Sequence, residues 1–314
     1  MKQTQKILLT GATGYVGAKL LRELEHQGHR IHCLTRNPDK LQHTGPKTRV
    51  YKGDVMIRSS MWQAFRGVDT AYFMVHMLHE REDFERKEIE AAENFAAMAR
   101  SAGVKRIIYL GALGNDRDAL SPHLQSRQDV GLALRQSDIP VLELRASIVI
   151  GKGSLSFEMI RDLTERLPFM VTPRWVSTPA QPIGVNDLLR YLVEGKDIPM
   201  EHDEIVEIGS QNRMSYGQLM QEYARQRGLK RAMLPVPILS PKLSSHWLAL
   251  ITHIDPVIGR KLIEGIKNPT VVESTRAAEL YDINPLSVER AMAEALAETP
   301  FRQTHKGLEH VYAA

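Results

Sequence analysis

Three evenly spaced glycines, Gly11, Gly14 and Gly17, have the residue type and spacing needed to hold a phosphate group close to the backbone. They follow an apolar, strand-like run at residues 7–9 and precede an amphipathic, helix-like run at residues 19–24. Gly11 can take the tight turn, Gly14 lets the backbone approach a pyrophosphate, and Gly17 lets the helix pack on the strand. The helix N-terminus adds free N–H groups and a positive dipole end. This GxxGxxG pattern predicts a dinucleotide site; the alternative is a structural turn that binds no phosphate.

Arg36 stands at the end of a predicted second strand, residues 30–35, where the adenosine ribose of a dinucleotide would lie. An acid at that place accepts a hydrogen bond from the 2′-hydroxyl of NAD, whereas an arginine pairs with the 2′-phosphate of NADP. Asp39 is a candidate for the NAD-type acid, but it follows Pro38 and falls beyond the strand. We therefore expect NADP(H) in preference to NAD(H); the alternative for Arg36 is a solvated surface side chain.

Asp54 and Val55 follow the third predicted strand, residues 48–52. An aspartate at the carboxyl end of a strand can accept a hydrogen bond from the adenine amino group. It is also a good helix N-cap for the segment that begins at Met56, and one residue can serve both roles.

These candidate residues need a scaffold that gathers strand ends, and the alternation of apolar runs with helical patterns predicts one. We expect strands at residues 6–10, 30–35, 48–52, 70–75, 106–110 and 141–144. Helices are expected at residues 16–26, 58–65, 84–102 and 124–136. Parallel crossovers are right-handed, so the predicted fold class is α/β with a doubly wound parallel sheet, the Rossmann arrangement.

Beyond residue 150 the alternation becomes irregular, which predicts a smaller, mostly helical C-terminal lobe. We divide the chain into an NAD(P)-binding domain at residues 1–150 and a substrate or cap lobe at residues 151–314, with residues 178–230 returning to the sheet. The apolar run within residues 157–175 is placed to cover a ligand pocket or to form the core of the lobe. The proline-spaced tail from residue 235 predicts a helical cap over the open edge of the sheet.

Composition excludes several classes of protein. The chain has 314 residues, 43% of them hydrophobic, and its net charge of +4 comes without a basic run, so we expect no nucleic-acid partner. No apolar stretch reaches the roughly twenty residues of a transmembrane segment. The single cysteine, Cys33, and an N-terminus unlike a signal peptide predict a cytoplasmic location. Histidine and cysteine spacing predicts no metal site.

The predicted helix at residues 84–102 carries interleaved charges, among them Glu85, Arg86, Glu88 and Glu90. Such alternation is typical of a solvated helix face held by opposite-charge pairs.

The chain resembles the short-chain dehydrogenase/reductase superfamily in a set of motifs that occur in the expected order: residues 10–17, Arg36, and residues 53–55, 103–106 and 144–146. More narrowly, they resemble its atypical, NmrA-like branch of predicted nucleoside-diphosphate-sugar epimerase-type proteins. The resemblance implies that the pyrophosphate is held by Gly11, Thr13, Gly14, Tyr15 and Val16 and that the adenine meets Asp54 and Val55. It also implies that the nicotinamide half is lined by Met74, Val75, His76, Leu110, Gly111, Ala112, Ala146 and Ile148.

The chemistry of that superfamily uses a serine, a tyrosine and a lysine four residues after the tyrosine. The tyrosine exchanges a proton with the substrate oxygen, and the lysine lowers the tyrosine pKa towards neutrality. In the matching segment, residues 121–127, His123 replaces the tyrosine and Arg127 replaces the lysine. The serine position falls within residues 111–113, which carry no hydroxyl. The chain therefore departs from the family at every catalytic position that can be matched.

The missing tyrosine leaves three interpretations of the site. His123 acts as the general acid while Arg127 orients the nicotinamide ribose, because an imidazole titrates near neutrality. Alternatively, the proton comes from water or another residue, which suits quinones and other activated acceptors. In the third interpretation the chain binds NADP(H) without turnover, as a sensor or assembly protein with a protein partner or a second copy of itself. We expect an NADP(H)-dependent oxidoreductase acting on a small carbonyl or quinone-like acceptor; the absent tyrosine disfavours a sugar-nucleotide epimerase.

Overall fold

The computed structural model describes residues 4–41, 44–77, 83–115, 117–236 and 255–298. Its largest element is a seven-stranded parallel sheet with the strand order β11-β6-β5-β4-β1-β2-β3. The strands are β1 (Lys6–Thr10), β2 (Arg30–Thr35), β3 (Thr48–Lys52), β4 (Thr70–Phe73), β5 (Arg106–Ala112), β6 (Val141–Ala146) and β11 (Glu204–Ile208). The chain winds outward from β1 in both directions, so the predicted doubly wound α/β fold is confirmed.

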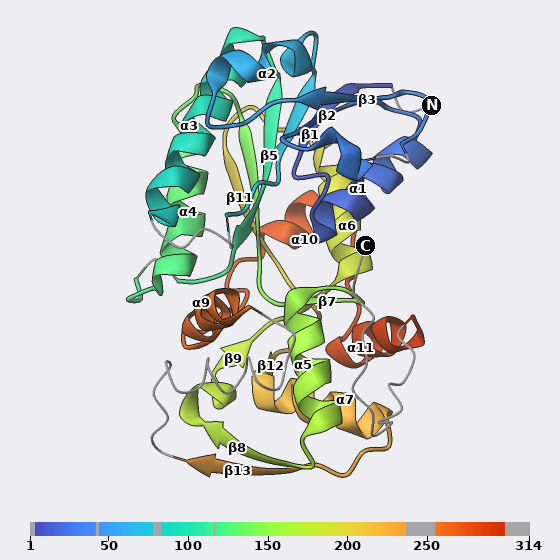
Figure 1. The fold of residues 1–314 in the computed structure, drawn as a ribbon, viewed down its shortest axis with the longest axis vertical. Coiled ribbons are helices and arrows are strands. Elements are labelled where there is room, and N and C mark those ends of the chain that lie inside the picture. Colours follow the sequence, from blue (N-terminus) through green and yellow to red (C-terminus); the bar gives the residue numbers. More distant parts are fainter. Residues whose placement is uncertain (1–3, 42–43, 78–82, 116, 237–254, 299–314) are drawn as a thin grey trace.

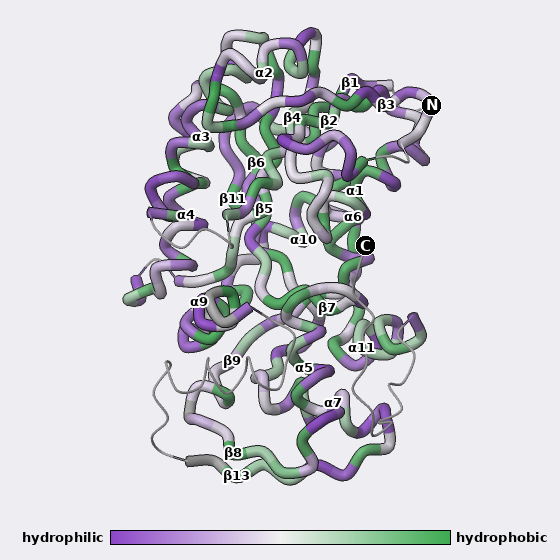
Figure 2. The backbone as a smooth tube through the Cα atoms, in the orientation of Figure 1, coloured by the Kyte–Doolittle hydropathy of each residue, from purple (hydrophilic) through white to green (hydrophobic). Residues whose placement is uncertain are grey.

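Helices cover both faces of this sheet (Figure 1). One face carries α2 (Arg58–Phe65), α3 (Phe84–Ser101) and α4 (Pro122–Arg135), and the other carries α1 (Tyr15–His26) and α6 (Val185–Gly195). Hydrophobic segments run along the strands between these layers, and the outer helices are more hydrophilic (Figure 2). This two-sided cover is what a fully parallel sheet requires, because both of its faces are apolar.

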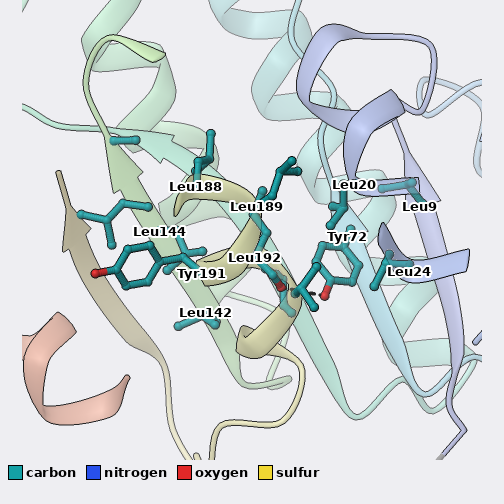
Figure 3. Packing of buried hydrophobic residues seen from close by; sticks show 14 of the residues in the cluster. Leu9, Leu20, Leu24, Tyr72, Leu142, Leu144, Leu188, Leu189, Tyr191 and Leu192 are labelled. Atoms are coloured by element: carbon teal, nitrogen blue, oxygen red, sulfur yellow. Dashed lines mark hydrogen bonds between the residues drawn. The ribbon is translucent and has the colours of Figure 1, made fainter. Parts of the chain in front are cut away.

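Helix α6 closes the core on the α1 side of the sheet. Leu188, Leu189 and Leu192 of α6 are buried among side chains from α1, β4 and β6 (Figure 3). The Tyr72 hydroxyl donates a hydrogen bond to the Leu192 carbonyl oxygen at 2.9 Å, which satisfies a polar group within this apolar layer. The buried Cys33 belongs to the same core, so the side chain lies where its apolar surroundings predicted.

A smaller lobe lies beyond the carboxyl ends of the strands (Figure 1). Its elements are β7 (Val149–Ile150), α5 (Leu155–Arg166), β8 (Phe169–Pro173), β9 (Pro179–Ala180), β10 (Ile183–Gly184), β12 (Met214–Ser215), α7 (Tyr216–Gln226), β13 (Ala232–Val236), α9 (Pro256–Ile266) and α11 (Val288–Ala297). Helix α10 (Arg276–Leu280) lies between α9 and α11 in the chain but packs on the large sheet. The short strands pair as β7 with β10, β8 with β13 and β9 with β12. A separate apolar core holds the lobe together.

The segment from residue 235 agrees only in part with the prediction of a helical cap over the open edge of the sheet. Helix α10 lies beside the edge strand β11, where Arg276 forms an ion pair with Glu204 at 2.6 Å. Helix α9 instead packs against α4, and α11 packs against α7 and β10 within the lobe. Residues 237–254, at the start of this tail, lie outside the described residues.

Candidate active site

The loops after β1 and β4 meet at the point where the strand order reverses. The Thr10 hydroxyl joins them, because it donates to the Tyr72 carbonyl oxygen and accepts from the Met74 amide, both at 3.0 Å. That second bond draws Met74 out of the ladder, so β4 ends at Phe73 rather than at the predicted residue 75. Gly11 has φ +68°, and a β-carbon there would overlap the Met74 carbonyl oxygen. Only glycine fits this approach, which forms the crevice where open parallel sheets bind ligands.

The glycine loop leads directly into α1. Gly14 is the N-cap residue, no side chain caps the helix, and the first turn carries no acidic residue. A β-carbon at Gly17 would overlap the Gly11 carbonyl oxygen, so Gly17 sets the packing of the helix on the turn. Gly14 is different, because its β-carbon would meet only the Gly11 carbonyl oxygen, at 3.3 Å, and otherwise open space. Thr13 and Gly14 are exposed. The loop therefore fits a pyrophosphate, with uncapped N–H groups beside an accessible backbone.

The predicted adenosine side lies at the ends of β2 and β3. Arg36 is exposed and has no hydrogen bond or ion pair with the described part of the chain, so its guanidinium is open to an anion. Asp39 falls in a short 3₁₀ turn at Pro38–Leu41, beyond the strand. Asp54 accepts a hydrogen bond from the Met56 amide at 3.0 Å through Oδ1, which makes it a local turn residue rather than the N-cap of α2. Val55 is buried in the core beside it.

Arg127 occupies the place of the family lysine, but its guanidinium points at the ends of two strands. It donates to the Leu110 carbonyl oxygen at 2.5 Å and to the Val75 carbonyl oxygen at 3.4 Å. It also lies 4.8 Å above the Tyr109 ring and is 6% exposed. Arg127 therefore joins the loop after β4 to the end of β5, two of the segments expected to line the nicotinamide half.

Glu88 corrects the prediction of a fully solvated face on α3. Glu88 is 2% exposed, whereas Arg86 and Glu90 form the expected exposed pair at 3.3 Å. The Glu88 carboxyl group accepts hydrogen bonds from the Met77 amide at 2.7 Å and from the Ser126 hydroxyl at 2.6 Å. These partners come from the loop after β4 and from α4, so the sequence of α3 alone carries no sign of this burial.

His123 lies in the first turn of α4, and its ring stacks on that of His76. The two ring centroids are 5.1 Å apart at an interplanar angle of 22°. His123 Nδ1 is buried and has no hydrogen-bond partner among the described residues. Burial, together with the positive charges of Arg127 and Lys261, lowers the pKa of His123 to about 4. The imidazole is therefore neutral at pH 7 and carries one N–H donor and one acceptor nitrogen. This is not the solvated surface histidine that would be the plainest interpretation of the sequence.

A cavity of about 140 Å³ opens beside His123 at the ends of β5 and β6. Three predicted nicotinamide-side residues, Ala112, Ala146 and Ile148, line it together with His123. Gly111 lies next to Ala112 in β5, where it is paired with Arg145 of β6. Both strands extend two residues beyond their predicted ends, because this pairing continues through Ala112 and Ala146. The catalytic candidate His123 and these cofactor candidates are thus brought to one place.

Sequence reasoning missed the polar side chains of the cavity. The Ser147 and Thr270 hydroxyl oxygens lie 2.6 Å apart, and Tyr216 hydrogen-bonds to Ser156. Burial raises the pKa of Tyr216 to about 12. Asn268 accepts from the Ser121 amide and donates to the Ala119 carbonyl oxygen, both at 3.0 Å. Ser147 lies between two predicted residues and was within reach of the sequence analysis; the others carried no local signal.

The apolar run within residues 157–175 does not line the cavity. Phe157, Met159, Ile160 and Met170 are buried in the core of the lobe, and Phe169 faces solvent. The core interpretation of this run is the correct one. The cavity wall on that side is instead formed by Ser156, Tyr216, residues 178–180 and the end of α9.

Two further features concern the residues that the structure describes. In that part of the chain, no helix is both long and apolar enough to span a membrane. The same residues contain no group of three histidine, cysteine, aspartate or glutamate side chains arranged for a metal ion.

Comparison with known proteins agrees with the fold. Residues 11–144 match the family model described as NAD(P)H-binding. The Citrobacter sp. triphenylmethane reductase complexed with NADP(H) superposes with a TM-score of 0.73 at 21% identity, covering 92% of this chain and 99% of that one. The Bordetella bronchiseptica enzyme WbmG in complex with NAD gives a TM-score of 0.73 at 16% identity and covers 94% of each chain. The match over residues 11–144 and the shared fold agree with the resemblance of the motifs to the short-chain dehydrogenase/reductase superfamily.

A relative is also found by sequence. The ceramide reductase of Caulobacter vibrioides (strain NA1000 / CB15N) is 26% identical over 262 residues, which cover 81% of each protein.

Proposed function

We propose that the protein is an NADP(H)-dependent oxidoreductase that transfers hydride to a small, uncharged carbonyl or quinone-like acceptor. One observation carries the proposal: the carboxyl ends of the same sheet carry the glycine loop, after β1, and a cavity lined by Ala112, Ala146, Ile148 and His123, at the ends of β5 and β6. The first three are the residues expected beside a nicotinamide. A bound reduced nicotinamide would supply the hydride, and the cavity would hold the acceptor next to it.

In this proposal the chain holds the cofactor along the carboxyl ends of its strands. Thr13, Gly14, Tyr15 and Val16 present backbone N–H groups to the pyrophosphate, and Gly11 and Gly17 shape the turn. Asp54 keeps one carboxylate oxygen available for the adenine amino group, because only Oδ1 is engaged with Met56. Residues 74–76 and 110–112 border the nicotinamide half, held together from behind by Arg127.

Preference for NADP(H) over NAD(H) rests on Arg36. Its guanidinium is exposed at the end of β2 and engages no carboxylate in the described chain. A planar fork of N–H donors suits a phosphate dianion. Of the two structures of similar fold, triphenylmethane reductase is complexed with NADP(H) and WbmG with NAD, so the proposed preference depends on Arg36 alone.

The class of acceptor follows from the lining of the cavity. Among the described residues that line the cavity, none is an aspartate, glutamate, lysine or arginine. An anionic acceptor would lose its hydration there without a charged partner, which costs several kcal/mol, on the order of the penalty for an unpaired buried charge. A neutral carbonyl compound loses far less, and the hydroxyl and imidazole groups can hydrogen-bond its oxygen. The ceramide reductase of similar sequence is by name also a reductase.

His123 is the proposed donor to the acceptor oxygen. As a neutral imidazole it stabilises the developing negative charge on that oxygen with its N–H. Because the pKa of His123 is lowered to about 4, the ring is not the general acid titrating near neutrality that the sequence suggested, and the proton that completes the alcohol or hydroquinone comes from water. A quinone demands little acid catalysis, so loss of this donor should weaken carbonyl reduction more than quinone reduction.

The experiment mixes purified protein and NADPH with neutral quinones and enones, and with carboxylate or sulfonate analogues of the same compounds. We expect NADPH oxidation with neutral acceptors and at least a tenfold lower kcat/KM with the charged analogues. No acceptor-dependent oxidation by any compound would contradict the enzyme proposal.

A second candidate, a sensor or assembly protein that binds NADP(H) without turnover, is favoured by the engagement of Arg127. Its guanidinium is held by backbone carbonyls and is not part of the cavity wall, unlike a catalytic lysine. This candidate predicts tight NADPH binding, no oxidation with the acceptors above, and a protein partner or homodimer that depends on the cofactor. In either case we propose a cytoplasmic location, since buried Cys33 is the only cysteine and needs no oxidising compartment.

A further inference from the structure

We infer that Glu88 and His76 are positioning residues that fix the His123 ring at the wall of the cavity. The kinetic part of this inference rests on the proposed oxidoreductase function, whereas its structural part does not.

The first link is the burial of Glu88. A buried carboxyl group is costly unless its oxygens are satisfied, and both oxygens of Glu88 are. One oxygen takes the Met77 amide and the other takes the Ser126 hydroxyl. Glu88 thus ties the loop after β4, which carries His76, to the helix α4, which carries His123. Arg127, 4.0 Å away on the same helix, adds a favourable charge.

The second link is the contact between the two imidazoles. His76 Nε2 lies 3.8 Å from Glu88 Oε1, and the His76 ring stacks on the His123 ring at 5.1 Å. This contact covers one face of His123 and restricts its rotation. The end of α9 lies close by, where a β-carbon on Gly265 would stand 3.7 Å from His123 Cδ2.

Fixing this ring matters because its Nδ1 has no hydrogen bond of its own among the described residues. A catalytic imidazole is normally held in one orientation by a carboxylate or a carbonyl on its second nitrogen. For His123, stacking takes over part of that role. A misplacement of about 1 Å at a reacting group can cost on the order of a hundredfold in rate, so a rigid ring has a direct kinetic value.

The experiment compares His76→Phe, which keeps an aromatic ring for stacking, with His76→Ala, which removes it. Long-range ¹H–¹⁵N spectra of the full-length protein follow the His123 imidazole through a pH titration. The charged and titratable groups around this ring are His76, Arg127 and Lys261, and Glu88 lies next to His76. We expect the midpoint to stay near that of the parent protein in His76→Phe and to rise towards 6.5, by one pH unit or more, in His76→Ala, because water reaches the ring.

Glu88→Gln tests the first link, and Glu90→Gln is its control, since Glu90 lies on the exposed side of the same helix. We expect Glu88→Gln to move the His123 titration in the direction of His76→Ala and Glu90→Gln to leave it unchanged. Identical His123 titrations in His76→Phe and His76→Ala would overturn the inference, as would a Glu88→Gln titration equal to that of the parent.

Kinetics provide the second readout. Both His76 variants touch the proposed cofactor site, so we expect them to change the Kd for NADPH alike. They should differ in kcat for a carbonyl acceptor, with His76→Ala about tenfold below His76→Phe; equal kcat values would overturn the positioning role. If no acceptor is reduced by the parent protein, the proposed function fails, and the titrations still decide whether Glu88 and His76 fix the His123 ring.

Discussion

Tyr15 and Gly151 lie in direct contact between the glycine loop and the start of the second lobe. The Tyr15 hydroxyl fills the space that a β-carbon on Gly151 would need. None of the described residues hydrogen-bonds this buried hydroxyl, and burial raises its pKa well above the usual value. The residue that opens α1 therefore also fixes the approach of the lobe, through shape rather than through a hydrogen bond.

Tyr15→Phe should leave the free energy of unfolding unchanged or raise it by up to about 1 kcal/mol, because it removes a buried hydroxyl without a partner. Tyr72→Phe is the matched comparison. This change removes the hydrogen bond to the buried Leu192 carbonyl oxygen, so we expect it to lower the free energy of unfolding by about 1–2 kcal/mol. Urea unfolding of both variants measures the difference. A Tyr15→Phe protein less stable than Tyr72→Phe would show that the Tyr15 hydroxyl has an important partner.

Arg36→Ala should raise the Kd for NADPH about 10- to 100-fold, since a charge-assisted hydrogen bond to phosphate contributes about 1.5–3 kcal/mol. The Kd for NADH should change less than about twofold, because NADH lacks the 2′-phosphate. Arg30→Ala removes the same charge from the exposed opposite end of β2 and should leave both constants unchanged. Isothermal titration calorimetry provides all of these values. Equal losses for NADPH and NADH would mean that Arg36 does not contact the phosphate.

Gly14→Ala and Gly17→Ala should separate binding from folding. At Gly14, φ is −88°, so alanine adopts the backbone without strain, and its methyl group meets only the Gly11 carbonyl oxygen, at 3.3 Å. We expect less than about 1 kcal/mol of lost stability and at least a tenfold weaker NADPH affinity. Gly17→Ala overlaps the Gly11 carbonyl oxygen and should cost about 1–3 kcal/mol of stability. Thermal unfolding measures the stability of both variants, and calorimetry measures their NADPH affinity. Unimpaired NADPH binding by Gly14→Ala would show that this loop does not bind the phosphate.

Acid should destabilise the protein through His123. Its pKa falls from 6.5 in the unfolded chain to about 4 in the fold, so between these values the unfolded state binds more protons. The free energy of unfolding should therefore fall as the pH drops from 6.5 to 4, by up to about 3 kcal/mol from this residue, and level off below.

Urea unfolding across this pH range measures the loss, and His123→Gln should show a flatter dependence than the parent protein. His202→Gln is the control, because His202 is exposed. If His123→Gln and the parent lose stability in parallel, the imidazole of His123 does not carry the acid sensitivity.

The sequence predicted those parts of the fold that depend on local pattern. β1, β2, β3 and α2 have the expected bounds, because apolar periodicity and turn residues are encoded within each segment. The end of β4 was wrong by two residues, since it is set by the Thr10 hydroxyl across the sheet. The prediction that Glu88 is solvated was wrong for the same kind of reason, because its partners, Met77 and Ser126, lie elsewhere in the chain.

The candidate site divides in a similar way. The glycine loop and Arg36 form contiguous patterns in a known register, and they could be assigned from the sequence. Tyr216, Asn268 and Thr270 reach the cavity from positions far along the chain, and no nearby residue signals that they do. Their placement follows from how α7 and the segment after α9 pack, which periodicity alone does not determine.

The two parts of the candidate site, the crevice at the glycine loop and the cavity beside His123, thus come from different regions of the chain. The crevice proposed for the nucleotide is built from turns within the first half of the chain, while Tyr216 and several of residues 262–270 line the chamber proposed for the acceptor. Substitutions late in the chain can reshape that chamber while the crevice stays intact. In the proposed oxidoreductase, acceptor choice is therefore free to diversify at constant cofactor preference, and libraries confined to residues 262–270 are the direct route to new substrates.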